Sequence, residues 1–245
     1  MVNVHIHQFQ GGSAVVDASA LEQFQTQWTT YQKLVDNNLL SHTTVGNLLG
    51  SALVEEFRRP FSILDIACGD ASLMKRVLPA TNVDHYHGID LAEPALDLAA
   101  KNLSGMPFAV ELDHRDFVEA MNDRPEPAEV SWCSLSIHHL PTEDKLRLLK
   151  AVRGATNSFL MVYEPTRLDG EDRGAYLDRF ARINRALWTM LTPGEWDQIQ
   201  HHVRTADLPE TSAVWLDLGR QAGFSRARQL FVDPTDFYRL YRYDD

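Results

Sequence analysis

Two short segments of the sequence combine small and acidic residues in a pattern that could bind a nucleoside. The first, Leu64-Asp-Ile-Ala-Cys-Gly-Asp-Ala71, has small residues that would let a ligand approach the backbone of a tight turn. The second, Gly88-Ile-Asp90, ends in a carboxylate 21 residues beyond Gly69. A carboxylate at the end of the second strand of an α/β sheet can accept hydrogen bonds from both hydroxyls of a ribose. We therefore expect a cofactor that contains a nucleoside.

The first of these turns is a poor site for phosphate groups. A dinucleotide-binding turn has three glycines in the pattern G-x-G-x-x-G, whereas this turn contains Gly69 alone. Asp70, at the expected start of the following helix, would repel a pyrophosphate. A cofactor without phosphates fits these residues better.

The turns must be positioned by a sheet, because short apolar runs alternate with helical segments along the chain. We expect helices at residues 72–78, 93–103, 142–154 and 209–222. We expect strands at residues 61–67, 85–90, 108–113, 130–135, 158–163, 231–232 and 237–241. This alternation predicts an α/β fold, a Rossmann-like, doubly wound and mostly parallel sheet of seven strands with a helical cap. Ligands of such sheets bind at the carboxyl ends of the strands, where both segments lie.

Two segments outside this alternation are predicted to be helical, whereas the first dozen residues show no clear pattern. Apolar spacings of three and four indicate an amphipathic helix over residues 18–40, and Ser41 is a suitable N-cap for a second helix that Pro60 ends. Residues 166–207 are charged, aromatic and compatible with helices. We divide a single domain into a core (61–165 and 208–245), an N-terminal helical cap (14–60) and an inserted helical lid (166–207).

The composition is that of a globular protein and argues against several classes of function. The 245 residues are 44% hydrophobic and 23% charged, and no apolar run is long enough to span a bilayer. The net charge of −11 and the lack of a basic stripe argue against a nucleic-acid or anionic-membrane partner. Two cysteines are too few for a disulfide scaffold or a zinc cluster, and the N-terminus lacks the features of a secretory signal. We expect a cytoplasmic protein.

Four motifs, in this order, resemble those of class I S-adenosylmethionine (SAM) methyltransferases. The segment that ends at Ala71 is similar to their first motif, although Ala67 and Ala71 stand where the family usually has glycine. The other three are Tyr86-His-Gly-Ile-Asp-Leu-Ala-Glu-Pro-Ala-Leu96, His114-Arg-Asp-Phe117 and Leu135-Ser-Ile-His-His-Leu-Pro141. The resemblance covers about residues 61–165. It implies a Rossmann-like fold and SAM as the cofactor, with S-adenosylhomocysteine as its product.

The resemblance also assigns cofactor contacts to eight residues: Asp65, Ala67, Gly69, Asp90, Leu91, Asp116, Phe117 and Leu135. It implies that Asp65 lies under the methionine end of SAM, that Gly69 lets the turn pass close to the cofactor and that Asp90 holds the ribose. The leucine after Asp90 and the phenylalanine after Asp116 would pack against adenine, whose amino group would donate to Asp116. Two simpler interpretations stay open: Asp116 could cap a helix, and Asp90 could be an ordinary acid at a strand end.

Histidines after the fourth strand are the best candidates for acid–base chemistry. His138 and His139 lie where the methyl group of SAM would point, and one of them could accept a proton near neutral pH. In the similar phosphoethanolamine methyltransferases, a histidine here acts with a tyrosine of the N-terminal helix, and Tyr31 and His139 could occupy these positions across the acceptor pocket. The alternatives are that His139 orders the loop and that Tyr31 only packs in an apolar stripe. Glu164, which ends the fifth strand, is a further candidate, and His42 is a weaker one.

The resemblance implies transfer of the SAM methyl group to a nitrogen, oxygen or sulfur atom of a small molecule in the capped pocket. An arginine of the lid could bind a carboxylate of this acceptor, although such arginines more often lie on a solvated helix face. The arginines are Arg167, Arg173, Arg179, Arg182 and Arg185. Two alternatives stay open, a relative of the carboxy-SAM synthases of tRNA modification and a SAM-binding protein without catalysis. We predict no metal, because His201 and His202 have no cysteine or acid at metal-ligand spacing.

Overall fold

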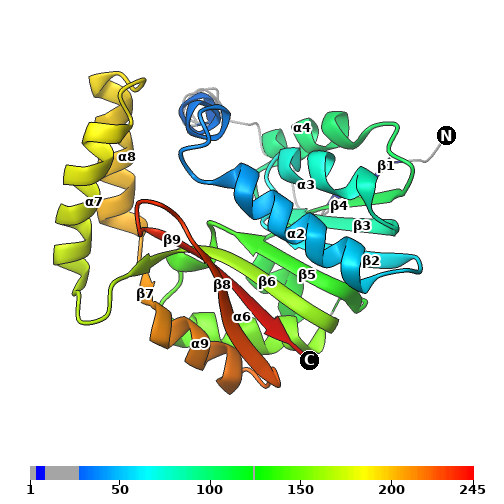
Figure 1. Cartoon of the computed structure of the whole chain (residues 1–245). Coiled ribbons are helices and arrows are strands. Elements are labelled where there is room, and N and C mark those ends of the chain that lie inside the picture. Colours follow the sequence, from blue (N-terminus) through cyan, green and yellow to red (C-terminus); the bar gives the residue numbers. More distant parts are fainter. Residues whose placement is uncertain (1–3, 9–27, 124) are drawn as a thin grey trace.

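The computed structural model describes residues 4–8, 28–123 and 125–245 of the chain. The centre of the fold is a parallel sheet of β2 (Phe61–Ile66), β3 (Val83–Asp90), β4 (Ala109–His114), β5 (Ala128–Ser134) and β6 (Thr156–Arg167). A hairpin of β8 (Arg226–Val232) and β9 (Tyr238–Asp244) continues this sheet, with β9 antiparallel to β6. These seven strands follow the order β4-β3-β2-β5-β6-β9-β8 (Figure 1). The order confirms the predicted Rossmann-like, doubly wound and mostly parallel sheet.

Two further strands lie outside the seven that the sequence predicts. β1 (Val4–Gln8) pairs in parallel with β4 at the edge of the sheet, and β7 (Glu210–Thr211) pairs with the end of β6. β1 alternates apolar and polar residues over too few positions for periodicity to reveal it. Its hydrogen-bond partners come from the edge of β4, which is distant in sequence. Both strands therefore form through tertiary pairing rather than through a strong local signal.

The strands are apolar because helices cover both faces of the sheet. One face carries α2 (His42–Glu56), α3 (Ser72–Val77) and α4 (Glu93–Leu103), and a short 3-10 helix, η1 (Leu78–Ala80), follows α3. The other face carries α5 (Phe117–Asn122), α6 (Thr142–Gly154) and α9 (Ser212–Gln221). Side chains of β2 alternate between the two cores, with Ile63 in one and Leu64 in the other. This packing fixes the strand ends, and with them the turns that carry the site.

α2 is part of the wall of the core rather than of a cap over the strand ends. Its buried residues Val45, Leu49 and Leu53 join the core that covers this face of the sheet. The apolar stripe of α2 requires such a surface, because a cap helix would leave it exposed. Of the predicted N-terminal cap, the helix of residues 28–36 lies beside the site, whereas residues 14–27 are outside the described residues.

The turn before α2 differs from the prediction in its capping group. Ser41 has a left-handed backbone (φ 53°), and its side chain makes no capping hydrogen bond. Instead, Oδ1 of Asn38 accepts a hydrogen bond from the backbone N–H of Thr43 at 2.9 Å. A side-chain oxygen therefore satisfies one of the free N–H groups at this helix end, but it comes from an earlier residue than expected.

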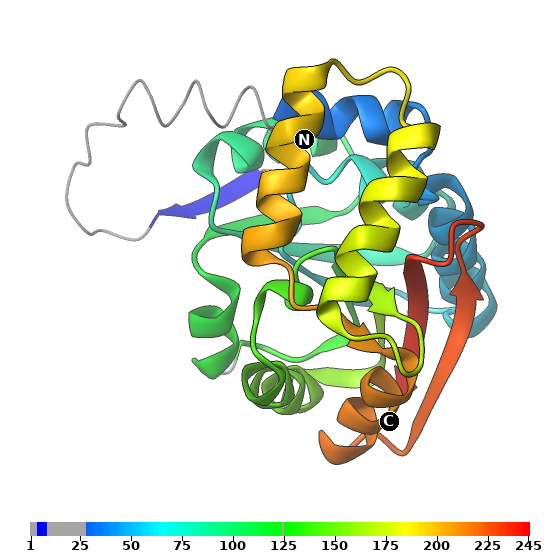
Figure 2. The same ribbon diagram turned by 90° about the vertical axis from the view of Figure 1, so that its left-hand side faces the viewer.

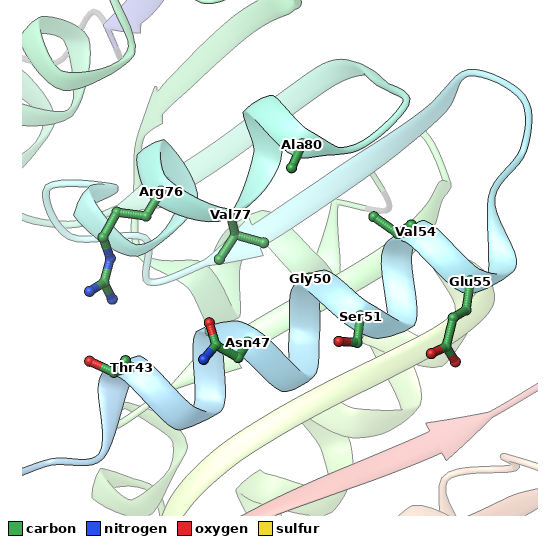
Figure 3. A pocket seen from close by; sticks show the side chains of 10 residues that line it. Thr43, Asn47, Gly50, Ser51, Val54, Glu55, Arg76, Val77 and Ala80 are labelled. Carbon is green, nitrogen blue, oxygen red and sulfur yellow. The ribbon is translucent and has the colours of Figure 1, made fainter.

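A surface groove of about 500 Å³ lies between α2 and the α3–η1 segment (Figure 3). Gly46 lets α2 pack closely against α3 beside this groove, since a Cβ atom added there would lie only 2.9 Å from Leu73. Its polar lining residues include Thr43, Asn47, Ser51, Glu55 and Arg76. None of the residues predicted to bind cofactor lines this groove, so it is separate from the site described below.

Two antiparallel helices of the inserted segment, α7 (Arg173–Leu187) and α8 (Pro193–Ala206), lie beyond the carboxyl ends of the parallel strands (Figures 1 and 2). Aromatic rings join them, because Trp188 contacts Phe180 of α7 and Trp196 of α8 at centroid distances of 5.5 and 6.1 Å. An ion pair between Lys33 and Glu195 connects the helix of residues 28–36 to α8. In the described part of the chain, no helix combines the length and apolar character that crossing a membrane requires.

Candidate active site

The turn after β2 has an unusual backbone that brings three small residues to the carboxyl edge. Ala67, Gly69 and Ala71 have positive φ angles of 57°, 55° and 54°. Glycine adopts this left-handed conformation readily, whereas each alanine there costs roughly 1–2 kcal/mol. The turn is held by a hydrogen bond from the N–H of Cys68 to the carbonyl of Ile89, at 3.0 Å. The replacement of two family glycines by alanine therefore leaves the turn conformation in place, at the expense of local strain.

Asp90 connects this turn to the end of β3. Its Oδ2 accepts a hydrogen bond from the N–H of Gly69, and its Oδ1 accepts one from the N–H of Ala92, both at 2.8 Å. Burial raises the pKa of Asp90, and the hydrogen bonds from Ala92 and Gly69 oppose this rise. The carboxylate is thus fixed between two loops, with lone pairs left for a ligand.

Asp65 lies in β2 below the same turn and is almost fully buried. The hydroxyl of Tyr86 donates a hydrogen bond to its Oδ2 at 2.7 Å. Burial raises the pKa of Asp65 to about 7, the hydrogen bond from Tyr86 opposes the rise, and the charges of Asp90 and Asp70 add to it. A buried carboxyl group with this pKa is stabilised as the carboxylate when a cation binds beside it.

A cavity of about 220 Å³, the first cavity, lies above these acids. Five of the eight predicted cofactor residues line it, namely Asp65, Ala67, Gly69, Asp90 and Leu135. Trp28, Tyr31 and His42 enclose it from the side of the N-terminal helices. The first cavity therefore brings together the two segments that the sequence analysis paired, and it adds two residues that sequence reasoning missed or ranked low, Trp28 and His42.

The remaining three predicted cofactor residues lie outside the first cavity. Leu91 is 63% exposed, which is high for a large apolar side chain. Oδ1 of Asp116 accepts from the N–H groups of Val118 and Glu119 at 2.8 and 3.1 Å, so this residue is the N-cap of α5. Phe117, the first residue of α5, packs against the core that α5 and α6 share. The helix-cap interpretation of Asp116 is thus the one that its contacts support.

A second cavity of about 260 Å³ adjoins the first, because Tyr31 and Leu135 line both. His138 and His139 also line it, together with the lid residue Asp207. The rest of its lining is largely apolar and includes Leu34, Leu40, Phe180, Trp188, Ile199 and Val203. Leu135 has a positive φ of 53°, which turns the chain at the end of β5 between the two cavities.

Glu164 organises the loop that carries the two histidines. It is fully buried, and its Oε1 accepts from the backbone N–H groups of Ser136 and Ile137 at 3.0 and 2.8 Å. Its Oε2 lies 2.6 Å from Nδ1 of His138. Burial lowers the pKa of His138, but Glu164 and Asp207 outweigh burial and raise it to about 9. Glu164, predicted as a catalytic candidate, therefore positions this loop and orients His138.

His139 has the opposite electrostatic environment. Burial lowers its pKa to about 4, the neighbouring His138 lowers it further, and Asp207 opposes this effect. Its ring centroid lies 4.0 Å from that of His138 and 5.1 Å from that of His202 in α8. Sequence reasoning missed Asp207 and His202 as partners, because only the folding of the lid brings them to this loop.

The hydroxyl of Tyr31 finds its polar partner in the second helix rather than in the histidine loop. It is hydrogen-bonded with Nε2 of His42 at 3.1 Å. Burial raises the pKa of Tyr31 well above its ordinary range, and the charge of Asp70 adds to this rise. Burial lowers the pKa of His42 to about 4, helped by the charge of Arg76. Tyr31 and His139 nevertheless line the same cavity.

Three of the five lid arginines make hydrogen bonds that hold the lid together. Arg173 donates to the carbonyl of Asp207 at 2.7 Å, and Arg179 binds both carboxylate oxygens of Glu171 at 2.7 and 2.9 Å. Arg167 donates to the carbonyl of Pro209 at 2.7 Å. Among the described residues, no arginine lines either cavity. The expectation that a lid arginine binds an acceptor carboxylate therefore finds no support in this arrangement.

Residues 63–158 match the family model described as a methyltransferase domain. This match identifies this part of the chain as a methyltransferase domain, and the strand order gives it the Rossmann-like fold that the motifs indicated. No curated protein matches the sequence of the chain.

Solved structures with this fold include several methyltransferases of low sequence identity. Magnesium protoporphyrin IX methyltransferase (ChlM) from Synechocystis PCC 6803, with bound SAM, has a TM-score of 0.59 and 12% identity, over 95% of this chain and 99% of its own. A possible exported protein from Bordetella parapertussis has a TM-score of 0.61 and 18% identity, over 82% of this chain and 67% of its own. The mitomycin 7-O-methyltransferase MmcR has a TM-score of 0.59 and 18% identity, over 94% of this chain and 59% of its own. The chain spans 54% of the length of another solved structure, that of the pyocyanin biosynthetic protein PhzM. These likenesses establish the fold alone.

Proposed function

We propose that the protein transfers the methyl group of SAM to a nitrogen, oxygen or sulfur atom of a small molecule held in the second cavity. The observation that carries this proposal is the junction of the two cavities at Tyr31 and Leu135. SAM in the first cavity, with its ammonium group near Asp65 and its ribose on Asp90, would direct its methyl group toward this junction. Holding donor and acceptor in line at attack distance would supply much of the acceleration.

The acids of the first cavity match the two ends of SAM in charge and hydrogen bonding. The ammonium group of the methionine end is a cation that would stabilise Asp65 as a carboxylate. Asp90 is fixed by two backbone N–H groups and has lone pairs left for the ribose hydroxyls. The exposed side chain of Leu91 lies next to Asp90 in sequence and is, with Phe117, the proposed apolar contact for adenine. Asp116, whose Oδ1 caps α5, is proposed to accept from the adenine amino group through Oδ2.

His139 is the proposed general base, which removes a proton from a methyl acceptor that arrives protonated. A pKa of about 4 keeps its ring neutral at pH 7, whereas His138, with a pKa of about 9, is protonated there and is bound to Glu164. His138 and Glu164 would then act by holding the loop, and Tyr31 by closing the pocket above the acceptor. An amine that arrives unprotonated requires no base.

The lining of the second cavity also helps to distinguish methyl transfer from the two alternative functions. A carboxy-SAM synthase must bind an additional carboxylate, which favours cationic side chains, and no arginine lines either cavity within the described residues. A SAM-binding protein without catalysis has no need of a second, histidine-lined cavity beside the cofactor. The mostly apolar lining favours an acceptor with an apolar body and one polar nucleophilic group.

The test combines cofactor identification with a panel of acceptors. The cofactor that copurifies with the full chain is identified by mass spectrometry, and the protein is then incubated with SAM and aromatic hydroxyl, amine and thiol compounds. We expect SAM or S-adenosylhomocysteine and at least one methylated product, with loss of turnover but not of SAM binding in His139→Gln. Carboxy-SAM in the protein, or SAM binding without any methylated product, would favour one of the two alternatives.

A further inference from the structure

Three histidine side chains converge on one oxygen of Asp207 at the wall of the second cavity. Oδ1 of Asp207 lies 3.6 Å from Nε2 of His138, 3.6 Å from Nδ1 of His139 and 3.8 Å from Nε2 of His202. These separations are too long for hydrogen bonds. Oδ1 is buried and has no hydrogen-bond partner among the described residues. A buried carboxylate oxygen usually has a hydrogen-bond donor or an ion as its partner, and Oδ1 of Asp207 has neither within bonding distance among the described residues.

The spacing of these atoms fits one ion placed between them. Potential ligand atoms of His138, His139 and Asp207 all lie within 4.8 Å of one another. Two atoms bound at about 2.1 Å to one tetrahedral ion are roughly 3.4 Å apart, so the distances from Oδ1 of Asp207 to the three ring nitrogens need to contract by only a few tenths of an ångström. The side chains of His138 and Asp207 are each 7% exposed, which leaves them little contact with water as an alternative partner.

The surroundings hold these ligands in place. Nδ1 of His138 is bonded to the buried Glu164 at 2.6 Å, which leaves Nε2 to face Asp207. Binding of an ion at Nε2 would displace the proton that this nitrogen carries in the protonated ring. A carboxylate that orients a histidine through its other nitrogen is typical of metal sites, where it also raises the basicity of the ligand. The segment with Asp207 is fixed to the loop by a hydrogen bond from the N–H of Leu208 to the carbonyl of His138 at 2.8 Å, and Arg173 binds the carbonyl of Asp207.

We propose that His138, His139, His202 and Asp207 bind a divalent transition-metal ion of the zinc class. Three imidazole nitrogens and one carboxylate suit Zn²⁺ or Co²⁺, whereas Mg²⁺ and Ca²⁺ prefer sites made of oxygen atoms. The side chain of His202 is 56% exposed, so its position is the one that another ligand can take. The prediction of no metal considered His201 and His202 only as neighbours in sequence, and Asp207 and the histidine loop approach His202 only in the folded lid.

The ion would lie in the wall of the cavity that we assign to the acceptor. An acceptor hydroxyl or thiol bound to it would lose its proton more easily, because a metal ion lowers the pKa of an oxygen or sulfur ligand. The ion and an unligated His139 are thus two different means of removing the same proton. This use of the ion rests on the proposed methyl transfer, whereas binding of the ion does not.

The experiment measures metal binding directly on the full chain, prepared without a polyhistidine tag and stripped of metal with a chelator. Titration calorimetry with Zn²⁺ is expected to show one site per chain, and Co²⁺ to give the visible absorption of a site with nitrogen ligands. An excess of Mg²⁺ is expected not to compete. Absence of saturable binding of both Zn²⁺ and Co²⁺ by the wild-type protein would overturn the proposal without any need for a variant.

Variants then locate the site. His202→Ala is expected to weaken Zn²⁺ binding by about tenfold or more, whereas the adjacent and exposed His201→Ala serves as the matched control and leaves it unchanged. Glu164→Gln, which alters only the carboxylate behind His138, is expected to cost about 10- to 100-fold in Zn²⁺ affinity. Equal losses in His201→Ala and His202→Ala would contradict the assignment. Unchanged affinity in a folded Asp207→Asn protein, with SAM binding as the check on folding, would do the same.

Chelation separates this proposal from the proposed function. If methyl transfer occurs and falls after chelation, recovering with Zn²⁺, the ion acts on the acceptor. If methyl transfer persists unchanged in protein shown to be free of metal, the ion is not the acceptor's activator, and His139 retains that role. Zn²⁺ binding in a protein that methylates no acceptor would leave the metal site standing and the proposed function refuted.

Discussion

Protonation of one buried residue, Asp65, makes the stability of the folded protein depend on pH. The pKa of this carboxyl group in the folded, unliganded protein is about 7, against an ordinary value of 3.8, because the group is buried. Between these values the folded state holds a proton that the unfolded state has lost. The unliganded protein therefore loses stability as the pH rises from about 4 to about 7, and this loss is complete above pH 7.

Binding of SAM is expected to have the opposite dependence over this interval. The cationic ammonium group favours the carboxylate form of Asp65, so SAM affinity rises with pH by up to about tenfold per unit below pH 7, the limit for release of one proton. Calorimetry from pH 5.5 to 8 measures this slope. Asp65→Asn should flatten it and should also remove the loss of thermal stability between about pH 4 and pH 7. An equally steep slope in Asp65→Asn would show that another group releases the proton.

Asp90 gives a second prediction at this scale. Asp90→Ala removes the group that we place on the ribose, and loss of charged hydrogen bonds costs about 1.5–3 kcal/mol, or roughly 10- to 100-fold in SAM affinity. Asp84→Ala, at the exposed start of the same strand, is the control and should bind SAM like the wild type. Unchanged affinity in a folded Asp90→Ala protein would remove Asp90 from the ribose site.

At the scale of elements, closure of the site depends on contacts between segments that are distant in sequence. The helix of residues 28–36 contributes Tyr31 to both cavities and is tied to α8 by the ion pair of Lys33 and Glu195. Glu195 also completes a capping box with Thr192 at the start of α8. The interaction with Lys33 lowers the pKa of Glu195, as do the hydrogen bonds from Thr192. The helix of residues 28–36 and α8 therefore stabilise each other, and both contribute residues to the second cavity.

Removal of this ion pair should loosen the N-terminal helix without unfolding α8. Glu195→Gln keeps a side chain suited to the capping box but removes the charge. A partly exposed pair contributes about 0.2–1 kcal/mol, so amide hydrogen exchange of residues 28–36 should accelerate by about 1.5- to 5-fold. Lys33→Met should have a similar effect, and the double variant should be little worse than either single one. Additive effects of the two substitutions would mean that the residues act separately.

At the scale of the whole molecule, charge determines which partners can approach. The net charge is −11, from 34 acidic and 23 basic residues. Several arginines are already engaged, since Arg242 binds Glu56 and Asp244, and Arg153 binds Asp245. The excess of acidic residues opposes the approach of a phosphate backbone, whose binding depends on cations that displace its counterions.

We therefore expect no binding to tRNA or duplex DNA at physiological salt. A gel-shift titration of the full chain, with and without SAM, measures this directly. The same titration at low salt is the control for weak electrostatic contacts. A complex of submicromolar affinity that weakens steeply with added salt would contradict the prediction and would revive the alternative of an enzyme of tRNA modification.

The sequence alone was sufficient for the sheet and for the meeting of the first two acidic strand ends at its edge. Apolar runs and turn residues are local signals, and they placed β2 and β3 so that Gly69 and Asp90 meet at adjacent strand ends. Parallel strands bring their carboxyl ends to one edge, so neighbours in this half of the site follow from strand order. The pairing of Tyr86 with Asp65 crosses the same two strands.

The surroundings of the second cavity were decided only by the tertiary structure. Tyr31 pairs with His42 rather than with His139, and Asp207 and His202 join the histidine loop from a lid far along the chain. No periodicity encodes such contacts, because they depend on how whole helices pack over the strand ends. The same packing places α2 in the wall of the core, where its apolar stripe is buried. Local signals in the sequence therefore determined which turns meet at the sheet edge, and long-range packing determined which residues face them.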